Sequence, residues 1–139
     1  MIKILLTGSG SGGHLYPLIA VAEELQKEAA RQELKLDLLF MGTDGLLREV
    51  ASSVGIRFQA IASPKWRRYI STENFADILK APLGLLQALV YVWSYMPDLI
   101  FSKGSFDSFF PALAGKIFRI PVVIHESDVI PGKTNLWVG

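Results

Sequence analysis

A glycine-rich turn followed at once by a histidine is the part of the sequence best suited to chemistry. The turn reads Gly8-Ser9-Gly10-Ser11-Gly12-Gly13-His14, after a short aliphatic run and before a helical pattern. Glycines let the backbone approach a ligand closely, and the N-terminus of a following helix offers free N–H groups and a positive dipole end. Such a turn is suited to an anion or a sugar diphosphate. The candidate ligand-binding residues are Ser11, Gly12 and Gly13.

His14 is the candidate catalytic residue of this turn. We expect it in the first turn of the helix, where the helix dipole disfavours a protonated imidazole. A neutral imidazole can accept a proton from an attacking sugar hydroxyl. The sequence leaves open the alternative that His14 only satisfies a carbonyl group of the loop.

The same glycines permit a dinucleotide-binding interpretation. Gly8, Gly10 and Gly13 satisfy the GxGxxG spacing of nicotinamide and flavin enzymes. That interpretation also requires an acidic residue at the end of the second strand, where it binds the ribose. The second strand ends in Met41-Gly42, and Asp44 follows only after a further threonine. The fingerprint alone is weak, so an oxidoreductase is the less favoured alternative.

A second group of polar residues follows the last aliphatic run. Residues 120–124 are followed by His125-Glu126-Ser127-Asp128. The carboxyl ends of parallel strands meet at one edge of a sheet, so we expect these residues to face the same cleft as the glycine turn. His125 and Glu126 could form an acid–base pair, but adjacent residues of a strand point to opposite faces. At least one of the two is therefore expected to be structural.

A third turn is predicted at the same edge, after the fourth strand. It reads Ser102-Lys103-Gly104-Ser105-Phe106-Asp107-Ser108. Backbone groups of Gly104 and Ser105 are candidate ligand contacts. We expect Asp107 or Ser108 to cap the helix that follows.

Short aliphatic runs alternate with longer helical periods along the whole chain, which is typical of a parallel sheet wrapped by helices. The fold class is therefore α/β, with a Rossmann-like parallel sheet flanked by helices. The second helix should open at Thr43 or Asp44, and the third should bend or restart near Pro82. The pattern predicts strands near 2–7, 35–41, 57–62, 98–102 and 121–125, and helices near 18–29, 44–53, 73–95 and 108–118.

Composition limits the classes of partner. The 139 residues, 50% of them hydrophobic, suit one domain with a real core. Fourteen basic against thirteen acidic residues give a net charge of +1, so no global field attracts nucleic acid. Cysteine is absent, and no metal-ligand spacing is found, so we expect no metal. A reducing, cytoplasmic environment is the default expectation.

The uncharged stretch between Lys80 and Asp98 and the loop before it predict a membrane-docking surface. The stretch is shorter than the roughly 20 apolar residues of a spanning helix, so we expect a buried or interfacial helix. Cations near an anionic surface and aromatic residues at headgroup depth favour reversible attachment. A leucine stripe usually faces the core, and that alternative stays open for part of it. The docking candidates are Trp66, Arg67, Arg68, Leu83, Leu86 and Leu89.

Taken together, three spaced motifs resemble the N-terminal half of the MurG family of glycosyltransferases, which is glycosyltransferase family 28 with the GT-B fold. They are GSGSGGH, the Gly-x-Phe-type turn after strand four, and IPVVIHESDVIPGKTN. The resemblance covers essentially the whole chain. It implies two Rossmann-like domains, of which the N-terminal one takes the lipid acceptor and the C-terminal one most of the UDP-GlcNAc. Residues 1–139 would then be the acceptor-binding domain, incomplete at its C-terminal end, with the donor-binding domain absent.

The resemblance also implies roles for individual residues. Ser11, Gly12 and Gly13 match the loop that reaches the donor, with serine in place of the usual threonine. His14 matches the histidine proposed to assist deprotonation of the acceptor. Asp128 stands where the family has a donor-contacting asparagine, in a HEQN motif that reads HESD here and includes Glu126. The turn at Gly104-Ser105-Phe106 lacks the usual tyrosine hydroxyl. Leu83, Leu86 and Leu89 match the family's hydrophobic membrane patch.

The function implied is inverting transfer of GlcNAc from UDP-GlcNAc to an undecaprenyl-diphosphate-linked muramoyl pentapeptide, a step of peptidoglycan synthesis at the cytoplasmic face of the membrane. The family needs no bound metal or other cofactor for this step. We expect the fragment alone to be inactive. A membrane-docking acceptor subunit of a split lipid-linked GlcNAc transferase is the main alternative, and a dinucleotide-binding oxidoreductase domain is the weaker one. A second glycine-rich domain encoded after Gly139 would favour the first interpretation.

Overall fold

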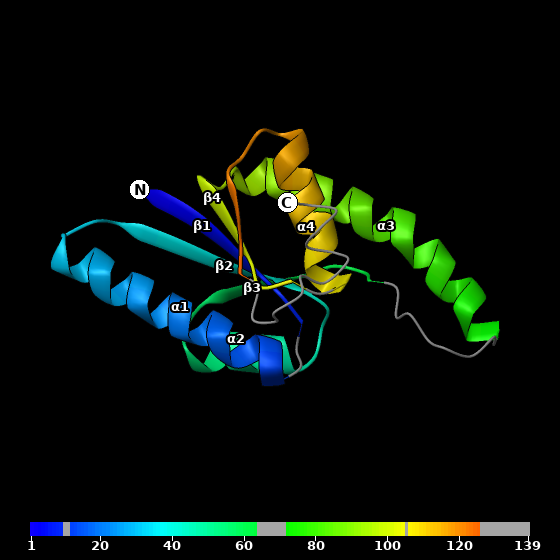
Figure 1. Cartoon of the computed structure of the whole chain (residues 1–139), viewed down its shortest axis with the longest axis horizontal. Coiled ribbons are helices and arrows are strands. Elements are labelled where there is room, and N and C mark those ends of the chain that lie inside the picture. Colours follow the sequence, from blue (N-terminus) through cyan, green and yellow to red (C-terminus); the bar gives the residue numbers. More distant parts are fainter. Residues whose placement is uncertain (10–11, 64–71, 105, 126–139) are drawn as a thin grey trace.

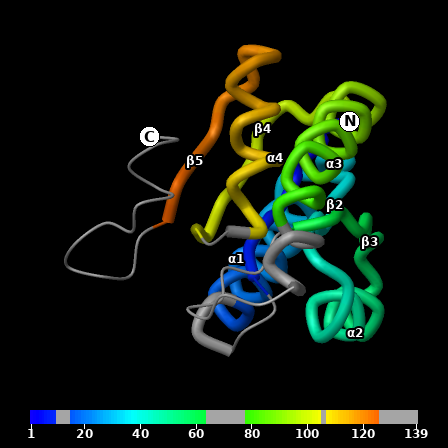
Figure 2. Tube along the Cα trace, turned by 90° about the vertical axis from the view of Figure 1, so that its right-hand side faces the viewer, coloured from blue at the N-terminus to red at the C-terminus, as the bar shows by residue number. Residues whose placement is uncertain are grey.

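The chain forms one parallel sheet covered by helices on both faces (Figure 1). The computed structural model describes residues 1–9, 12–63, 72–104 and 106–125. The strand order is β3-β2-β1-β4-β5, and all four pairings are parallel, which confirms the predicted α/β class. β3 and β5 lie at opposite edges of the sheet (Figure 2). The elements are β1 (Ile2–Thr7), α1 (Gly12–Arg31), β2 (Leu36–Gly42), α2 (Leu46–Ser53), β3 (Arg57–Ala60), α3 (Thr72–Tyr95), β4 (Leu99–Ser102), α4 (Phe106–Ile117) and β5 (Val122–Ile124).

The two faces of the sheet carry separate hydrophobic cores because side chains alternate along each strand. Ile4 and Leu6 of β1 pack with α1 and α2, whereas Leu5 between them packs with α3 and α4. Burial on both faces requires strands that are apolar at nearly every position. The continuous aliphatic runs of β1 and β2 follow from this requirement.

Two predicted helix starts need correction. α2 begins at Leu46 with Gly45 as its N-cap, at φ 140°, and not at Thr43 or Asp44. The Asp44 carboxylate instead accepts a hydrogen bond from Arg48 Nε one turn into the helix. α4 begins at Phe106, so Asp107 lies in its first turn and buried Ser108 lies inside it, and neither is the N-cap.

α3 continues through Pro82 without the predicted restart. Proline has no backbone N–H, so the carbonyl group four residues earlier loses its helical donor. Because Pro82 lies on the exposed side of the helix, solvent takes the place of that donor. The N-terminal part of α3 projects beyond the strands (Figure 1).

The segment after β3 fixes α3 to the body of the protein at one close crossing. A Cβ atom on Gly84 would lie 2.0 Å from the carbonyl oxygen of Ala62, so only glycine fits there. One turn further along α3, the Gln87 side chain accepts a hydrogen bond from the Ala62 N–H at 2.7 Å. A polar residue in this apolar helix is thus explained by a backbone donor that would otherwise lack a partner.

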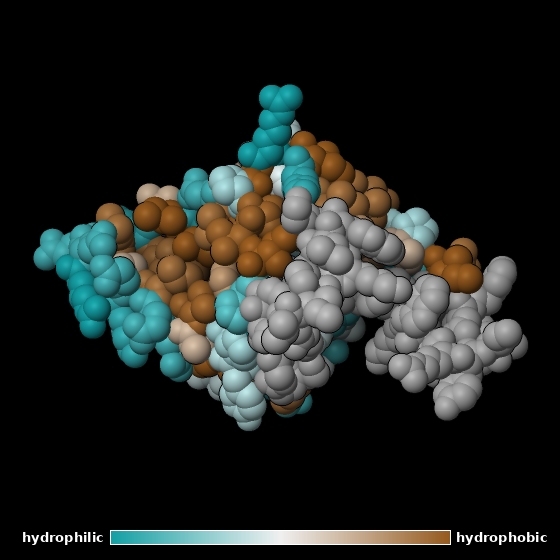
Figure 3. Space-filling model, in the orientation of Figure 1, coloured by the Kyte–Doolittle hydropathy of each residue, from teal (hydrophilic) through white to brown (hydrophobic). Residues whose placement is uncertain are grey.

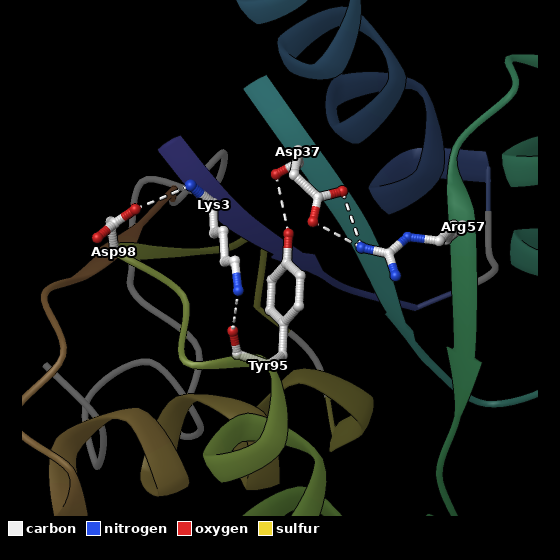
Figure 4. A network of polar contacts seen from close by, with 5 residues as sticks. All are labelled: Lys3, Asp37, Arg57, Tyr95 and Asp98. Atoms are coloured by element: carbon white, nitrogen blue, oxygen red, sulfur yellow. Dashed lines mark hydrogen bonds and ion pairs between the residues drawn. The ribbon is translucent and has the colours of Figure 1, made fainter. Parts of the chain in front are cut away.

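A polar network ties the C-terminal end of α3 to the amino edge of the sheet (Figure 4). The Tyr95 hydroxyl donates to the Asp37 carbonyl oxygen at 2.8 Å, and the Asp37 carboxylate accepts two contacts from Arg57 Nη2 at 2.6 and 2.8 Å. Lys3 Nζ donates to the Tyr95 carbonyl oxygen at 3.2 Å, and the Lys3 N–H donates to Asp98 at 2.8 Å. Burial, and after it the charge of Asp37, raises the pKa of the Tyr95 hydroxyl, which therefore stays a protonated donor.

Replacing Gly84 by alanine should destabilise the protein, although glycine-to-alanine changes inside unobstructed helices stabilise by about 1 kcal/mol. The new methyl group meets a backbone oxygen, which cannot rotate away. Thermal unfolding of the purified protein would show a lower Tm for Gly84→Ala. An unchanged or higher Tm would show that α3 moves away from Ala62 without loss.

Tyr95→Phe should lower the free energy of unfolding by about 1 kcal/mol through loss of one hydrogen bond. Tyr16→Phe, at a tyrosine with 73% exposure, is the matched control and should change nothing. A raised Tyr95 pKa contributes stability that is fully present below about pH 10 and is lost as pH rises further. The free energy of unfolding, measured with urea from pH 8 to 11, should therefore fall less steeply for Tyr95→Phe than for wild type. Parallel curves would show that titration of Tyr95 does not cause the loss of stability.

Candidate functional site

Thr7 joins three strands at the carboxyl edge of the sheet. Its side chain is fully buried, and its hydroxyl donates to the Met41 carbonyl oxygen of β2 at 2.8 Å. Its own carbonyl oxygen accepts the Lys103 N–H, just past β4, at 3.0 Å. The ends of β2, β1 and β4 are therefore level at the point where the glycine turn begins.

The outer strands join this edge in the same way. The Ile61 N–H donates to the Gly42 carbonyl oxygen at 3.0 Å, and the His125 N–H donates to the Ser102 carbonyl oxygen at 2.8 Å. Residues just past β3, β4 and β5 thus donate hydrogen bonds to the last residues of β2, β1 and β4. The beginning of the glycine turn, the beginning of the turn after β4 and His125 after β5 therefore share one edge, as predicted.

Gly8 is required by packing rather than by an unusual backbone conformation. A Cβ atom there would lie 2.6 Å from Leu18 Cδ1 and 3.2 Å from Lys103 Cβ. The glycine lets α1 approach β1 and β4 closely.

α1 begins at Gly12, so Gly12, Gly13 and His14 form its first turn, as predicted. The free N–H groups and the positive dipole end of this helix thus lie at the carboxyl edge, where an anion would be stabilised. Ser11 lies outside the described residues. The predicted ligand contacts of all four residues remain predictions.

In the turn after β4, the backbone conformation of one residue requires glycine. Gly104 has φ 87°, in the left-handed region that favours glycine, and its N–H donates to the Ser102 hydroxyl at 3.3 Å. This contact holds the turn against the end of β4. Ser105, the second ligand candidate of the turn, lies outside the described residues.

His125 is exposed at the end of β5, and its ring centroid lies 6.2 Å from that of Phe101. Phe101 packs with the core on the α1 side of the sheet, so the His125 ring lies on that side as well. Glu126 and Asp128 lie outside the described residues, so the acid–base pair and the donor contact stay predictions.

Three side chains at this edge were not proposed as functional from the sequence. Lys103 is 1% exposed, although a lysine in a predicted turn would ordinarily be expected in solvent. Thr43 and Ser63, after β2 and β3, have hydroxyl oxygens that are fully covered. Loop hydroxyls are common, and no local pattern distinguishes the buried ones.

No three His, Cys, Asp or Glu residues are placed to hold a metal ion in the part of the chain that the structure describes. A shallow, open groove of about 460 Å³ runs along the flank of α1, lined by Ala20, Val21, Glu24, Leu25 and Glu28. The groove begins more than a turn beyond the first turn of α1, and nothing in it indicates a ligand.

The docking stripe predicted on α3 needs one correction. Leu83 and Leu86 are exposed, but Leu89 is only partly exposed and packs against the core. Positions 84, 88, 92 and 95 of α3 are buried, so the opposite side of the helix carries the exposed residues. We define the α3 stripe as Leu79, Leu83, Leu86, Val90 and Trp93, which are 48–63% exposed. Trp66, Arg67 and Arg68 lie outside the described residues.

Apolar residues gather on the molecular surface along α3 in Figure 3. At the C-terminal end of the stripe the Trp93 ring lies 5.4 Å from that of Phe118, just after α4. Among the described residues, α3 is also the one helix long and apolar enough to cross a membrane by composition. Its packed inner side, with Ala88 and Val92 fully buried, is instead that of a helix lying on the protein.

Solved structures share this fold. MurG of Acinetobacter baumannii superposes with a TM-score of 0.76 at 22% identity, covering 99% of this chain and 38% of that one. UDP-GlcNAc 2-epimerase of Neisseria meningitidis, bound to UDP-GlcNAc, superposes with a TM-score of 0.58 at 18% identity, covering 99% and 34%. At such identities the likeness establishes the fold and not the reaction.

Sequence relatives are more similar. A Treponema pallidum (strain Nichols) protein named UDP-N-acetylglucosamine--N-acetylmuramyl-(pentapeptide) pyrophosphoryl-undecaprenol N-acetylglucosamine transferase is 39% identical over 130 residues, covering 93% of this chain and 33% of the relative. A protein of the same name from Clostridium kluyveri is 39% identical over 136 residues, covering 97% and 37%. The chain thus spans about a third of the length of these relatives.

Residues 4–139 match the glycosyltransferase family 28 N-terminal domain, which is nearly the whole sequence. The motifs of the glycine turn and of the end of β5 fall inside the matched range, and the fold agrees with that of a MurG structure. The chain therefore belongs to glycosyltransferase family 28, as its N-terminal domain.

Proposed function

We propose that the chain is the acceptor-side part of an inverting glycosyltransferase that moves GlcNAc from UDP-GlcNAc to an undecaprenyl-diphosphate-linked muramoyl pentapeptide. The observation that carries the proposal is 37–39% identity, over nearly the whole chain, to transferases named for this reaction. Because the chain spans a third of those relatives, the donor-binding part is assigned to sequence outside these residues, and the 139 residues alone are expected to be inactive.

The carboxyl edge suits this chemistry. In the proposed step the acceptor hydroxyl oxygen attacks the anomeric carbon, the bond from that carbon to the diphosphate breaks, and the configuration inverts. The leaving diphosphate takes the bonding electron pair as UDP. The first turn of α1 supplies backbone N–H groups and a positive dipole end, which stabilise a diphosphate in the cleft.

His14 is assigned the role of general base, which accepts the proton of the acceptor hydroxyl. Its place in the first turn of α1 favours a neutral imidazole, which is the form that accepts a proton. We assign substrate binding to three described glycines, Gly12, Gly13 and Gly104. We assign it also to four positions outside the described residues: Ser11, Ser105, Glu126 and Asp128.

The α3 stripe is assigned to docking on the cytoplasmic face of the membrane. Five large apolar side chains lie three or four residues apart on the outer side of a helix whose inner side is packed. An interfacial helix binds a bilayer through such a face. The basic segment with Trp66, Arg67 and Arg68 ends shortly before α3 begins and would add attraction to anionic lipids. Docking would hold the cleft beside a lipid-linked acceptor.

His14→Ala, made in the full-length protein, should lower kcat by about 10²- to 10⁴-fold with a much smaller change in KM, because the proton acceptor acts in the transition state. Steady-state kinetics with UDP-GlcNAc and the lipid acceptor measure this. Gln26→Ala, at an exposed position further along the same helix, is the control and should behave as wild type. A kcat within about threefold of wild type for His14→Ala would remove the general-base assignment.

Leu83→Gln/Leu86→Gln should weaken binding of the full-length protein to phosphatidylglycerol–phosphatidylcholine vesicles by at least about tenfold, since burial of each leucine contributes about 1.5–3 kcal/mol. Co-sedimentation measures the partition. Leu34→Gln/Leu46→Gln is the matched control, with leucines of 45% and 48% exposure away from α3.

The salt dependence separates the two parts of the docking surface. Trp66→Ala/Arg67→Ala/Arg68→Ala should weaken binding most at low salt, whereas the α3 variant should weaken it at any salt concentration. Equal loss for the α3 variant and its Leu34/Leu46 control, or no pelleting of wild type on anionic vesicles, would overturn the docking assignment.

A further inference from the structure

Two buried hydroxyl groups at the carboxyl edge have no hydrogen-bond partner: Thr43 Oγ1 and Ser63 Oγ. Ser63 is 5% exposed, and the Thr43 residue is partly exposed although its oxygen is covered. Buried side-chain hydroxyls are nearly always paired, since an unpaired one loses its water without compensation. An unpaired buried group therefore calls for a reason.

Thr7 provides the comparison within the same edge. Its buried hydroxyl donates to the Met41 carbonyl oxygen at 2.8 Å. The fold thus pairs a hydroxyl at the centre of the edge, where the group is structural. The unpaired hydroxyls of Thr43 and Ser63 contribute no such bond to the folded protein.

The two unpaired groups follow neighbouring strands. β2 and β3 are paired to Gly42 and Ala60, and the Ile61 N–H donates to the Gly42 carbonyl oxygen just beyond. Thr43 comes directly after Gly42, and Ser63 comes two residues after Ile61. Both therefore stand at the β2–β3 side of the edge that carries the glycine turn.

Ser63 also lies next to the segment that α3 holds. The preceding residue, Ala62, donates its N–H to Gln87 and lies against Gly84. Leu83 and Leu86, which flank these contacts on α3, are exposed parts of the α3 stripe. This corner is thus where the proposed membrane-facing helix meets the carboxyl edge of the sheet. A lipid-linked ligand whose tail lies in the membrane would present its head group here.

We propose that the Thr43 and Ser63 hydroxyls bind the acceptor substrate, by hydrogen bonds to neutral hydroxyl or amide groups of its sugar–peptide head. The proposal rests on the proposed function. A hydroxyl donates one hydrogen bond and accepts others, which suits uncharged groups of mixed character. The charged pair nearest in sequence, Asp44 with Arg48, is already mutually bonded. Rotation about χ1 redirects a Ser or Thr hydroxyl without a backbone change.

The test uses Thr43→Val and Ser63→Ala in the full-length protein, which remove each hydroxyl with little change in shape. Each should raise KM for the lipid-linked muramoyl pentapeptide roughly tenfold, the effect of one lost hydrogen bond. KM for UDP-GlcNAc should stay unchanged, and Tm should stay unchanged or rise. Thr7→Val should lower Tm. Ser52→Ala, at an exposed helix hydroxyl, should change neither Tm nor the two KM values.

A second measurement separates this proposal from the proposed function. Soluble N-acetylmuramoyl pentapeptide, without lipid or diphosphate, should bind wild type and bind the double variant Thr43→Val/Ser63→Ala at least tenfold more weakly. That result with a catalytically silent wild type would sustain the site and refute the transferase assignment. The proposal would be overturned if the acceptor KM and the binding of the muramoyl peptide were both unchanged. It would also be overturned if only the UDP-GlcNAc KM rose. A fall in Tm without any kinetic change, as expected if the hydroxyls only hold a structural water, would overturn it as well.

Discussion

The position of Thr7 governs the rest of the structure. It ends the central strand, and its hydroxyl and carbonyl groups connect that strand to β2 and to the residue after β4. Parallel strands joined in this way end at one level, so the turns that follow them must emerge side by side. Gly8 then leaves room for Leu18 of α1, which a Cβ atom at position 8 would meet at 2.6 Å. The arrangement of the candidate cleft follows from these backbone contacts before any ligand is considered.

The opposite edge of the sheet has a different task. Around Tyr95, two cations and a carboxylate bind the end of α3 to β1, β2 and β3. The Lys3 ammonium and the Arg57 guanidinium lie 5.5 and 5.7 Å from the centre of the Tyr95 ring. This edge is held by charged and aromatic side chains, whereas the carboxyl edge is held mainly by backbone hydrogen bonds and by the Thr7 hydroxyl. A division of this kind allows the cleft to vary among proteins of the same fold, and a transferase and an epimerase both superpose on this chain.

α3 connects the two proposed activities of the domain. Its inner side is held by Gly84 and Gln87 to the segment after β3, and its outer side carries the α3 stripe. A helix with one side packed and the other apolar and exposed suits attachment to a bilayer surface rather than passage through it. Because the held segment leads directly to Ser63, the proposed membrane-facing surface and the proposed acceptor contacts lie at one corner of the domain.

The sequence by itself determined the order and type of the elements, because strand and helix periods and turn residues are local signals. It also placed Gly12, Gly13 and His14 at a helix start, since a glycine turn between a strand and a helical pattern has few other readings. The roles of Ser11, Ser105, Glu126, Asp128 and the Trp66 segment remain sequence predictions, since those residues lie outside the described parts of the chain.

Only the tertiary structure decided which side chains are covered. Leu86 and Leu89 are both leucines of the same helix, but Leu89 packs against the core and Leu86 is exposed to solvent. Lys103 is buried beside Gly8, which is distant in sequence, and the covered hydroxyls of Thr43 and Ser63 lack a hydrogen-bond partner. Burial and hydrogen-bond pairing depend on residues that approach from elsewhere in the chain, and no local pattern records that approach.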